Sequence, residues 1–148
     1  MSTKLLAVGN VLMKDDGIAI YLAAELENRL EGLGIEVIYV ETDISYGISR
    51  IHDGDRVIIM DGARQGKAAG EVSLYDMEKA DRDRGDTDGH NISVINLIRL
   101  FYPGCRCFIL TIEVYEVDFH YGPSIVLKNR MPLIVQELIM KIDMALGA

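Results

Sequence analysis

The fold is decided by the stretch Leu5-Leu6-Ala7-Val8-Gly9-Asn10 and by the pattern that follows it. An unbroken apolar run predicts a strand that is covered on both faces, and Gly9-Asn10 ends that run. Asp15 or Asp16 then offers an N-cap for a helix. This helix carries one apolar stripe, because an aliphatic residue recurs every four positions: Ile18, Leu22, Leu26 and Leu30.

The next segment completes a parallel unit. Gly32 and Gly34 are typical helix stops, and residues 35–40 are rich in β-formers, which predicts a second strand. A strand, a helix and a strand in this order favour a right-handed crossover between parallel strands.

Further elements follow along the chain. We expect a short helix over residues 44–51, a turn at Asp53-Gly54-Asp55, a buried strand over 56–60 and an edge strand over 70–75. Residues 78–89 are polar and irregular, which predicts an exposed loop.

The second half adds two helices and one strand. A helix is expected from Asn91 to the stop at Pro103-Gly104, with these residues inward: Val94, Leu97, Ile98 and Phe101. A strand follows over 106–112. Pro132 is expected to open the last helix, whose apolar face is Val135, Leu138, Ile139, Ile142 and Leu146. The sum is one α/β domain over residues 1–148, a three-layer sandwich in which helices cover both faces of a mostly parallel, twisted sheet of about five strands.

Composition excludes several classes of function. The chain has 148 residues, 49% of them hydrophobic, which suits one domain with a continuous core. Its net charge of −8 argues against nucleic-acid binding, which needs a basic face. We expect no membrane segment and a cytoplasmic location, because the apolar run at residues 5–8 is too short for a signal peptide.

The two cysteines are interpreted as reduced thiols. Cys105 and Cys107 are two positions apart, so on a strand they share a face, but a disulfide between them would be strained. A metal site would need more ligands, and none lies close in sequence.

Three chemically useful side chains fall where ligands gather in open α/β sheets, beyond the carboxyl ends of the strands. Asp16 follows the first strand, Asp61 follows the third, and His90 lies where the polar loop becomes a helix. Two carboxylates and an imidazole are a sensible ligand set for a divalent transition metal. Three protein ligands leave coordination positions open for water or substrate, as catalysis requires.

Each of these residues also has a plainer explanation. Asp15 and Asp16 would cap a helix, with capping favoured for Asp15 and both roles open for Asp16. Asp61-Gly62 is an ordinary strand-ending turn, and a histidine at a helix start is commonly a surface residue. The sequence has no His-Glu-x-x-His helix, no Gly-x-Ser-x-Gly elbow, no Walker loop and no full dinucleotide fingerprint.

The motifs resemble those of the hydrogenase maturation endopeptidases. Residues 9–17, Gly-Asn-Val-Leu-Met-Lys-Asp-Asp-Gly, are similar to the family's opening signature. Residues 57–63, Val-Ile-Ile-Met-Asp-Gly-Ala, resemble its second signature, and His90-Asn91 before an apolar helix resembles the third. The resemblance runs from about Lys4 to Leu146, with matching order, spacing and length.

This resemblance implies a specific activity. Such enzymes bind the precursor of the large subunit of a nickel–iron hydrogenase after nickel has been inserted, and they remove a short C-terminal extension. The family's metal-binding trio maps onto Asp16, Asp61 and His90, which would also be the catalytic residues. The nickel would be supplied by the substrate, and zinc or cadmium would substitute for it in crystals. Family members generally act as monomers, so a monomer is expected.

Several positions depart from the family pattern. Many members have a small-residue Gly-Gly-Thr turn where this chain has Asp43-Ile44-Ser45, and Thr111-Ile112-Glu113-Val114 stands where the family often leads into Gly-x-Gln-Pro. His120 falls in another family-like segment, where a packing or surface role is favoured over the cleft. His52, beside Asp53-Gly54, is interpreted as a turn residue.

Two other functions are compatible with the sequence. The pocket would serve a binding module that recognises the metal centre of a hydrogenase precursor without cutting it. Alternatively, the chain would be an unrelated small α/β hydrolase or transferase for an anionic ligand, which a basic pocket near Arg50, Arg64 and Lys67 would favour.

Overall fold

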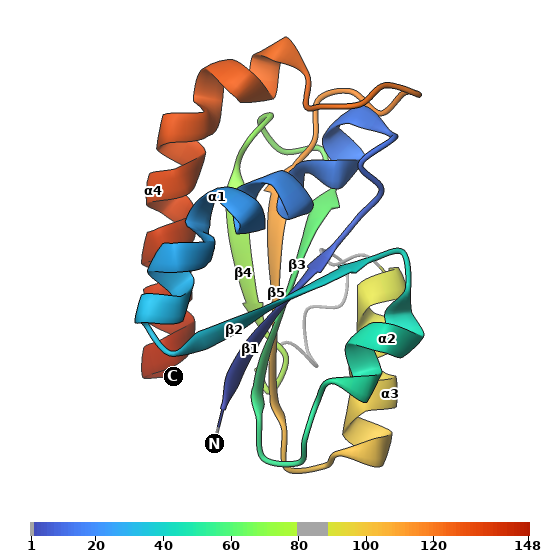
Figure 1. Cartoon of the computed structure of the whole chain (residues 1–148), viewed down its shortest axis with the longest axis vertical. Helices are drawn as coiled ribbons and strands as arrows, with labels where there is room; N and C mark the ends of the chain where they lie inside the picture. Colours follow the sequence, from blue (N-terminus) through green and yellow to red (C-terminus); the bar gives the residue numbers. More distant parts are fainter. Residues whose placement is uncertain (1, 80–88) are drawn as a thin grey trace.

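A five-stranded sheet with the order β2-β1-β3-β5-β4 runs through the middle of the molecule (Figure 1). Four strands are parallel, and β4 pairs antiparallel with β5 at one edge. The computed structural model describes residues 2–79 and 89–148. The expected loop over 78–89 therefore lies almost entirely outside the described residues.

The elements follow the predicted order. The strands are β1 (Thr3–Val8), β2 (Ile35–Glu41), β3 (Arg56–Ala63), β4 (Val72–Asp76) and β5 (Arg106–Glu113). The helices are η1 (Lys14–Gly17, a 3₁₀ turn), α1 (Ile18–Gly32), α2 (Ile44–Ser49), α3 (Gly89–Phe101) and α4 (Ile125–Gly147). The predicted class, a single mostly parallel sheet between helices, is confirmed.

The sheet separates two apolar layers. In β1, Leu5 packs with α1 and α4 on one face, whereas its neighbour Leu6 packs with α2 and α3 on the other. Figure 1 shows these helix pairs on opposite sides of the sheet. Alternate residues of a strand point to opposite faces, so a strand covered on both sides must be apolar throughout. This accounts for the unbroken apolar runs, and all four residues of the predicted α1 stripe are buried.

The start of α4 differs from the prediction. The helix begins at Ile125, and the Ser124 side chain caps it by accepting a hydrogen bond from the N–H of Leu127. Pro132 lies inside the helix instead of opening it. Proline removes one backbone donor, but residue 132 is exposed, so water can reach the carbonyl group that loses its partner.

The buried face of α3 also differs. Val94, Ile95 and Ile98 are buried, whereas Leu97 and Phe101 are 40% and 62% exposed. The predicted inward positions of Leu97 and Phe101 are therefore wrong. The predicted stripe and the observed stripe both have helical spacing, so periodicity alone did not show which of the two is buried.

Both cysteine thiols are buried and unbridged. Burial raises the pKa of Cys105, and it raises the pKa of Cys107 to about 12. Such thiols stay protonated and unreactive at neutral pH. Among the described helices, none is long and apolar enough to span a membrane.

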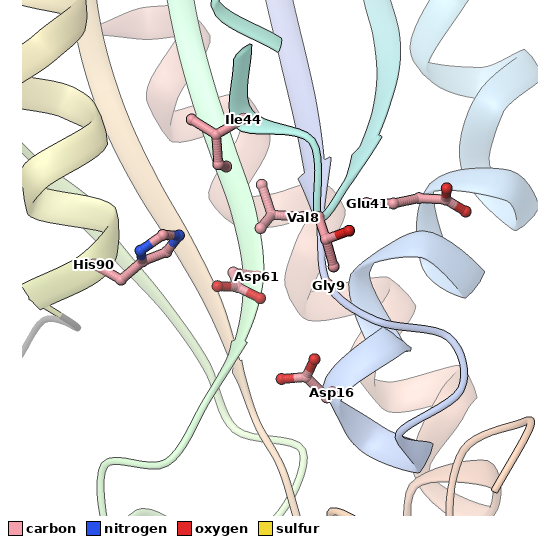
Figure 2. A pocket seen from close by; sticks show the side chains of 8 residues that line it. Val8, Gly9, Asp16, Glu41, Ile44, Asp61 and His90 are labelled. Atoms are coloured by element: carbon pink, nitrogen blue, oxygen red, sulfur yellow. The ribbon is translucent and has the colours of Figure 1, made fainter. Parts of the chain in front are cut away.

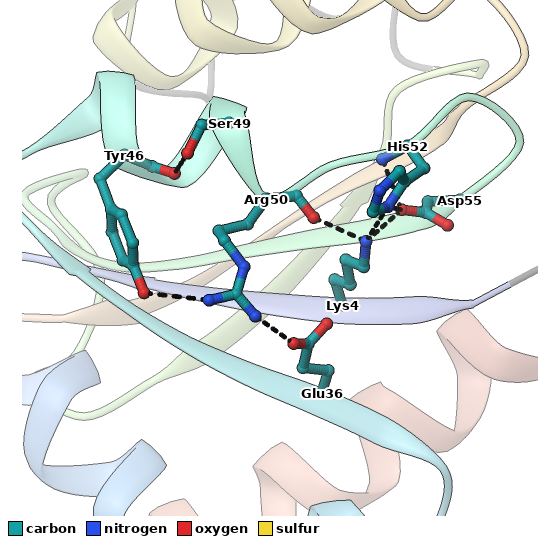
Figure 3. A network of polar contacts seen from close by, with 7 residues as sticks. All are labelled: Lys4, Glu36, Tyr46, Ser49, Arg50, His52 and Asp55. Atoms are coloured by element: carbon teal, nitrogen blue, oxygen red, sulfur yellow. Dashed lines mark hydrogen bonds and ion pairs between the residues drawn. The ribbon is translucent and has the colours of Figure 1, made fainter.

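A buried ion pair closes the amino end of the sheet (Figure 3). Lys4 Nζ lies 2.8 Å from Asp55 Oδ2 and 2.8 Å from His52 Nδ1, and it donates to the carbonyl oxygen of Arg50 at 2.6 Å. His52 lies in the expected turn, and its backbone N–H donates to the Asp55 carboxylate. Burial by itself would raise the pKa of Asp55, but the hydrogen bonds from Lys4 and His52 outweigh it and hold the pKa below its ordinary value.

At the opposite end of the sheet, the chain leaving β1 folds back tightly onto η1. Gly9 has φ +144°, and a Cβ atom there would lie 2.1 Å from the carbonyl oxygen of Asp16. Only glycine allows this approach. The return of the chain at Gly9 brings η1 next to the carboxyl ends of the strands.

The Gly9→Ala variant should be destabilised by about 3 kcal/mol or more, because it adds both a steric clash and backbone strain. Urea denaturation would measure the loss. Gly32→Ala is the matched control, since a Cβ at Gly32 meets no atom within 4 Å. That change should be neutral or slightly stabilising. Equal effects of the two substitutions would contradict the steric argument.

The Asp55→Asn variant should lose about 3 kcal/mol at pH 7, because it leaves the Lys4 ammonium buried without its counter-charge. A lowered folded-state pKa stabilises the protein above the unfolded pKa of about 4 and ceases to do so as pH falls through the folded value. The difference in stability between wild type and Asp55→Asn should therefore shrink on acidification below about pH 4. Urea denaturation between pH 7 and pH 3 tests this, and a constant difference would argue against it.

Candidate active site

A pocket of about 330 Å³ lies at the carboxyl ends of β1, β2 and β3 (Figure 2). Its lining contains all three residues selected from the sequence, and its full lining is Val8, Gly9, Asp16, Glu41, Thr42, Ile44, Asp61 and His90. Three segments that are distant in the chain thus contribute one acid or imidazole each to the same cavity.

Asp16 comes from η1. Its Oδ2 accepts a hydrogen bond of 3.0 Å from the N–H of Asn10, so the loop after β1 holds the side chain. In Figure 2 its carboxylate extends toward β3 and Asp61. It does not cap α1: Gly17 occupies the N-cap position, and no side chain caps that helix. The capping interpretation is wrong because the 3₁₀ turn intervenes between the aspartates and the helix.

Asp61 lies within β3 and pairs in register with Thr111 of β5, since the strand continues to Ala63. The interpretation of Asp61-Gly62 as a strand-ending turn is therefore wrong. The side chain is 7% exposed, and its Oδ2 accepts a hydrogen bond of 3.0 Å from Asn91 Nδ2. A carboxylate in this position is fixed by the sheet on one side and by α3 on the other.

His90 lies in the first turn of α3 and is exposed. Figure 2 shows its ring on the α3 side of the pocket, with Asp61 between it and Asp16 in this view. Within residues 2–79 and 89–148, however, no three His, Cys, Asp or Glu side chains are close enough to hold a metal ion. The three residues share an open pocket, and their role as metal ligands stays a prediction.

Asp15 has a different role from its neighbour. It is fully buried, and its carboxylate accepts hydrogen bonds from the backbone N–H groups of Tyr115, Glu116 and Ser124 and from Ser124 Oγ, at 2.6 to 3.0 Å. Asp15 thus ties η1 to the segment between β5 and α4. The two adjacent aspartates therefore have different roles: Asp15 anchors η1 through its hydrogen bonds, and Asp16 faces the pocket.

The end of β2 contributes pocket residues that the sequence did not indicate. Glu41 adopts φ +54°, and the register between β1 and β2 shifts there, so Val8 pairs with Glu41. A non-glycine residue with this backbone conformation is uncommon and occurs preferentially at functional sites. Thr42 and Ile44 line the pocket beside it. No sequence pattern marks this bulge, because residues 35–41 read as an ordinary strand.

The departures from the family pattern lie close to the pocket. Asp43, from the altered turn, caps α2 by accepting a hydrogen bond from the N–H of Tyr46. Glu113 is 4% exposed, and both of its carboxylate oxygens accept from the N–H of Gln65. Both acids thus accept hydrogen bonds from backbone N–H groups, Asp43 within its own turn and Glu113 from a distant segment.

The remaining candidates lie outside this pocket. His120 is exposed and lines a second cavity with Lys14 and Lys128, while its backbone pairs with Met13. Arg50 bonds Glu36 near the amino end of the sheet. Lys67 Nζ donates hydrogen bonds to the hydroxyl groups of Ser73 and Tyr75, in the region beyond the carboxyl end of β3. Arg50 and Lys67 therefore cannot share the basic pocket that an anionic ligand would need.

Solved structures of similar fold were found. The [NiFe] hydrogenase maturation protease HybD from Thermococcus kodakarensis has 25% identity and a TM-score of 0.71, over 96% of this chain and 99% of that one. The hydrogenase maturating endopeptidase HybD from E. coli has 16% identity and a TM-score of 0.74, over 98% and 94%. The endopeptidase HycI from Escherichia coli has 23% identity and a TM-score of 0.70, over 92% and 88%.

No protein-family model matches the sequence, and no curated protein matches it in a sequence search. Architecture and pocket define a single α/β domain with an acidic cavity at the carboxyl ends of its parallel strands. Structural similarity over nearly the whole chain confirms the resemblance inferred from the sequence: the chain is a divergent structural relative of the hydrogenase maturation proteases.

The different roles of Asp15 and Asp16 can be tested by comparing the stability of two variants. Asp15→Ala should cost about 3 kcal/mol or more in the free energy of unfolding, because four donors, two of them buried, lose their acceptor. Asp16→Ala should cost about 1 kcal/mol, since only the N–H of Asn10 loses a partner. Urea denaturation of both variants would show the difference, and similar losses would refute the assignment.

Proposed function

We propose that the protein is an endopeptidase that removes the C-terminal extension of a nickel-loaded nickel–iron hydrogenase large-subunit precursor, and that it recognises the bound metal. The observation that carries this proposal is the joint presence of Asp16, Asp61 and His90 in one pocket of a hydrogenase maturation protease fold. In this proposal the precursor is the protein partner, and its nickel is part of the substrate.

The chemistry of the three side chains supports metal recognition. Two carboxylates neutralise the charge of a divalent ion, and an imidazole suits nickel or zinc. The side chains line an open pocket and do not form a closed cluster. Such an arrangement suits a metal that arrives already held by the substrate, because the precursor keeps its own ligands and the pocket supplies the remaining ones.

Docking through the metal would place the scissile peptide beside the carboxylates. Fixing the reacting groups in this way contributes to the acceleration by itself. The metal, when bound, polarises the peptide carbonyl or lowers the pKa of a coordinated water. Alternatively, Asp16 or Asp61 acts as a general base on water instead of as a ligand, and the lesser burial of Asp16 favours it for that role.

A binding module that recognises the precursor without cutting it would use the same pocket. The peptidase and the binding module differ in whether the C-terminus of the precursor is cut. An unrelated hydrolase for an anionic ligand is not favoured, because the pocket contains two aspartates and a glutamate, and Arg50 and Lys67 lie apart from each other.

The His90→Ala variant should abolish processing of a nickel-loaded precursor, because the pocket loses its imidazole ligand. Mass spectrometry of the precursor's C-terminus would measure the cut. The fold should remain intact, since His90 is exposed. His120→Ala is the matched control: it removes an exposed imidazole outside this pocket and should leave processing unchanged.

Each outcome decides between the alternatives. Normal cleavage by His90→Ala would remove the trio from the mechanism. Wild-type protein that binds the nickel-loaded precursor and leaves its C-terminus intact would support the binding module instead of the peptidase.

A further inference from the structure

Asn91 is a buried amide that the proposed mechanism does not use. It lies in the first turn of α3, directly after His90, and it is 0% exposed. Its Nδ2 donates to Asp61 Oδ2 at 3.0 Å. This bond joins the helix that carries the imidazole to the strand that carries the carboxylate.

The oxygen of the same amide differs from its nitrogen. Asn91 Oδ1 is buried and accepts no hydrogen bond in the described part of the chain. A buried acceptor left unpaired costs about 1 to 3 kcal/mol. Because an apolar side chain of the same shape would avoid that cost, stability alone does not explain an asparagine at this position. What the side chain provides is a directed donor to Asp61.

The donor has a consequence for the carboxylate. A hydrogen bond to Oδ2 fixes the plane of the Asp61 carboxylate and therefore the direction in which Oδ1 faces. Figure 2 shows the two oxygens of Asp61 on different sides of the carboxylate, one of them on the side of Asp16. Partners that orient ligating groups in this way raise metal affinity or activity by about 10- to 100-fold.

We propose that Asn91 is a positioning residue: its hydrogen bond to Asp61 Oδ2 orients the carboxylate toward the incoming metal. This inference rests on the proposed function, because it assigns Asp61 a role as ligand. In this proposal two consecutive residues of α3 serve the same site: His90 is itself a ligand, and Asn91 orients the ligand Asp61.

The test is a double-mutant cycle between Asn91 and Asp61, read as the dissociation constant for Zn²⁺ by isothermal titration calorimetry. Asn91→Leu keeps the size of the side chain and removes both the donor and the orphaned oxygen, so the fold should persist. Its dissociation constant should rise by about 10- to 100-fold. Asp61→Ala should weaken binding further, and the double variant should match Asp61→Ala within about two-fold.

Ile95→Ala is the control for a merely structural effect. Ile95 is fully buried on the same helix, so its truncation lowers the stability of α3 packing. Its Zn²⁺ dissociation constant should stay at the wild-type value. A rise equal to that of Asn91→Leu would show that affinity follows the stability of the helix, and the positioning role would be lost.

The remaining outcomes separate this inference from the proposed function. Additive losses in the cycle, or unchanged affinity in Asn91→Leu beside a large loss in Asp61→Ala, would overturn only the role of Asn91. Unchanged affinity in Asp61→Ala would overturn the ligand assignment itself and this inference with it. No saturable Zn²⁺ binding by the wild type would overturn this inference, which requires a measurable affinity for Asn91 to raise, and would leave the proposed function standing, because there the substrate supplies the metal with ligands of its own.

Discussion

The buried carboxylate of Asp15 is the interaction on which the carboxyl end of the domain depends. It accepts four hydrogen bonds from the segment that joins β5 to α4, and it lies in the short turn between β1 and α1. A charge with no exposed surface is tolerated only where donors surround it. The first and last thirds of the chain are therefore locked together at this point, and Ser124, one of the donors, also caps α4.

These hydrogen bonds to Asp15 determine where the pocket can form. Gly9 lets the chain return within van der Waals distance of Asp16, and the anchored Asp15 prevents η1 from moving away. The next side chain, Asp16, then lies on the opposite side of the turn and faces the ends of the parallel strands. The hydrogen bonds of Asp15 fix the turn, and Asp16 is therefore held in place although it makes few contacts of its own.

The side chains that line the pocket differ in burial. Asp61 is fixed by the sheet and by Asn91, whereas His90 lies exposed at the start of α3. The bulge at Glu41, with its positive φ, also lines the pocket. Glu41 with its positive φ and the buried Asn91 Oδ1, which accepts no hydrogen bond within the described residues, lie at this end of the sheet. At the amino end Lys4 is held by an ion pair, but the buried Nε atoms of Arg56 and Arg106 also lack partners within the described residues. The uncommon backbone conformation of Glu41 is therefore the feature that distinguishes the proposed site, since such conformations cluster at functional sites.

The sequence alone determined the order of elements, the parallel crossover, the α1 stripe and the three residues that line the pocket, because apolar periodicity and the positions of strand ends are local properties. It did not determine the buried role of Asp15, which stripe of α3 is buried, where α4 begins, or the pairing of Asn91 with Asp61. Those outcomes depend on contacts between segments 30 to 109 residues apart, such as Asn91 with Asp61 and Ser124 with Asp15. Only the tertiary structure brings such groups together, since no periodicity within one segment records the geometry of another.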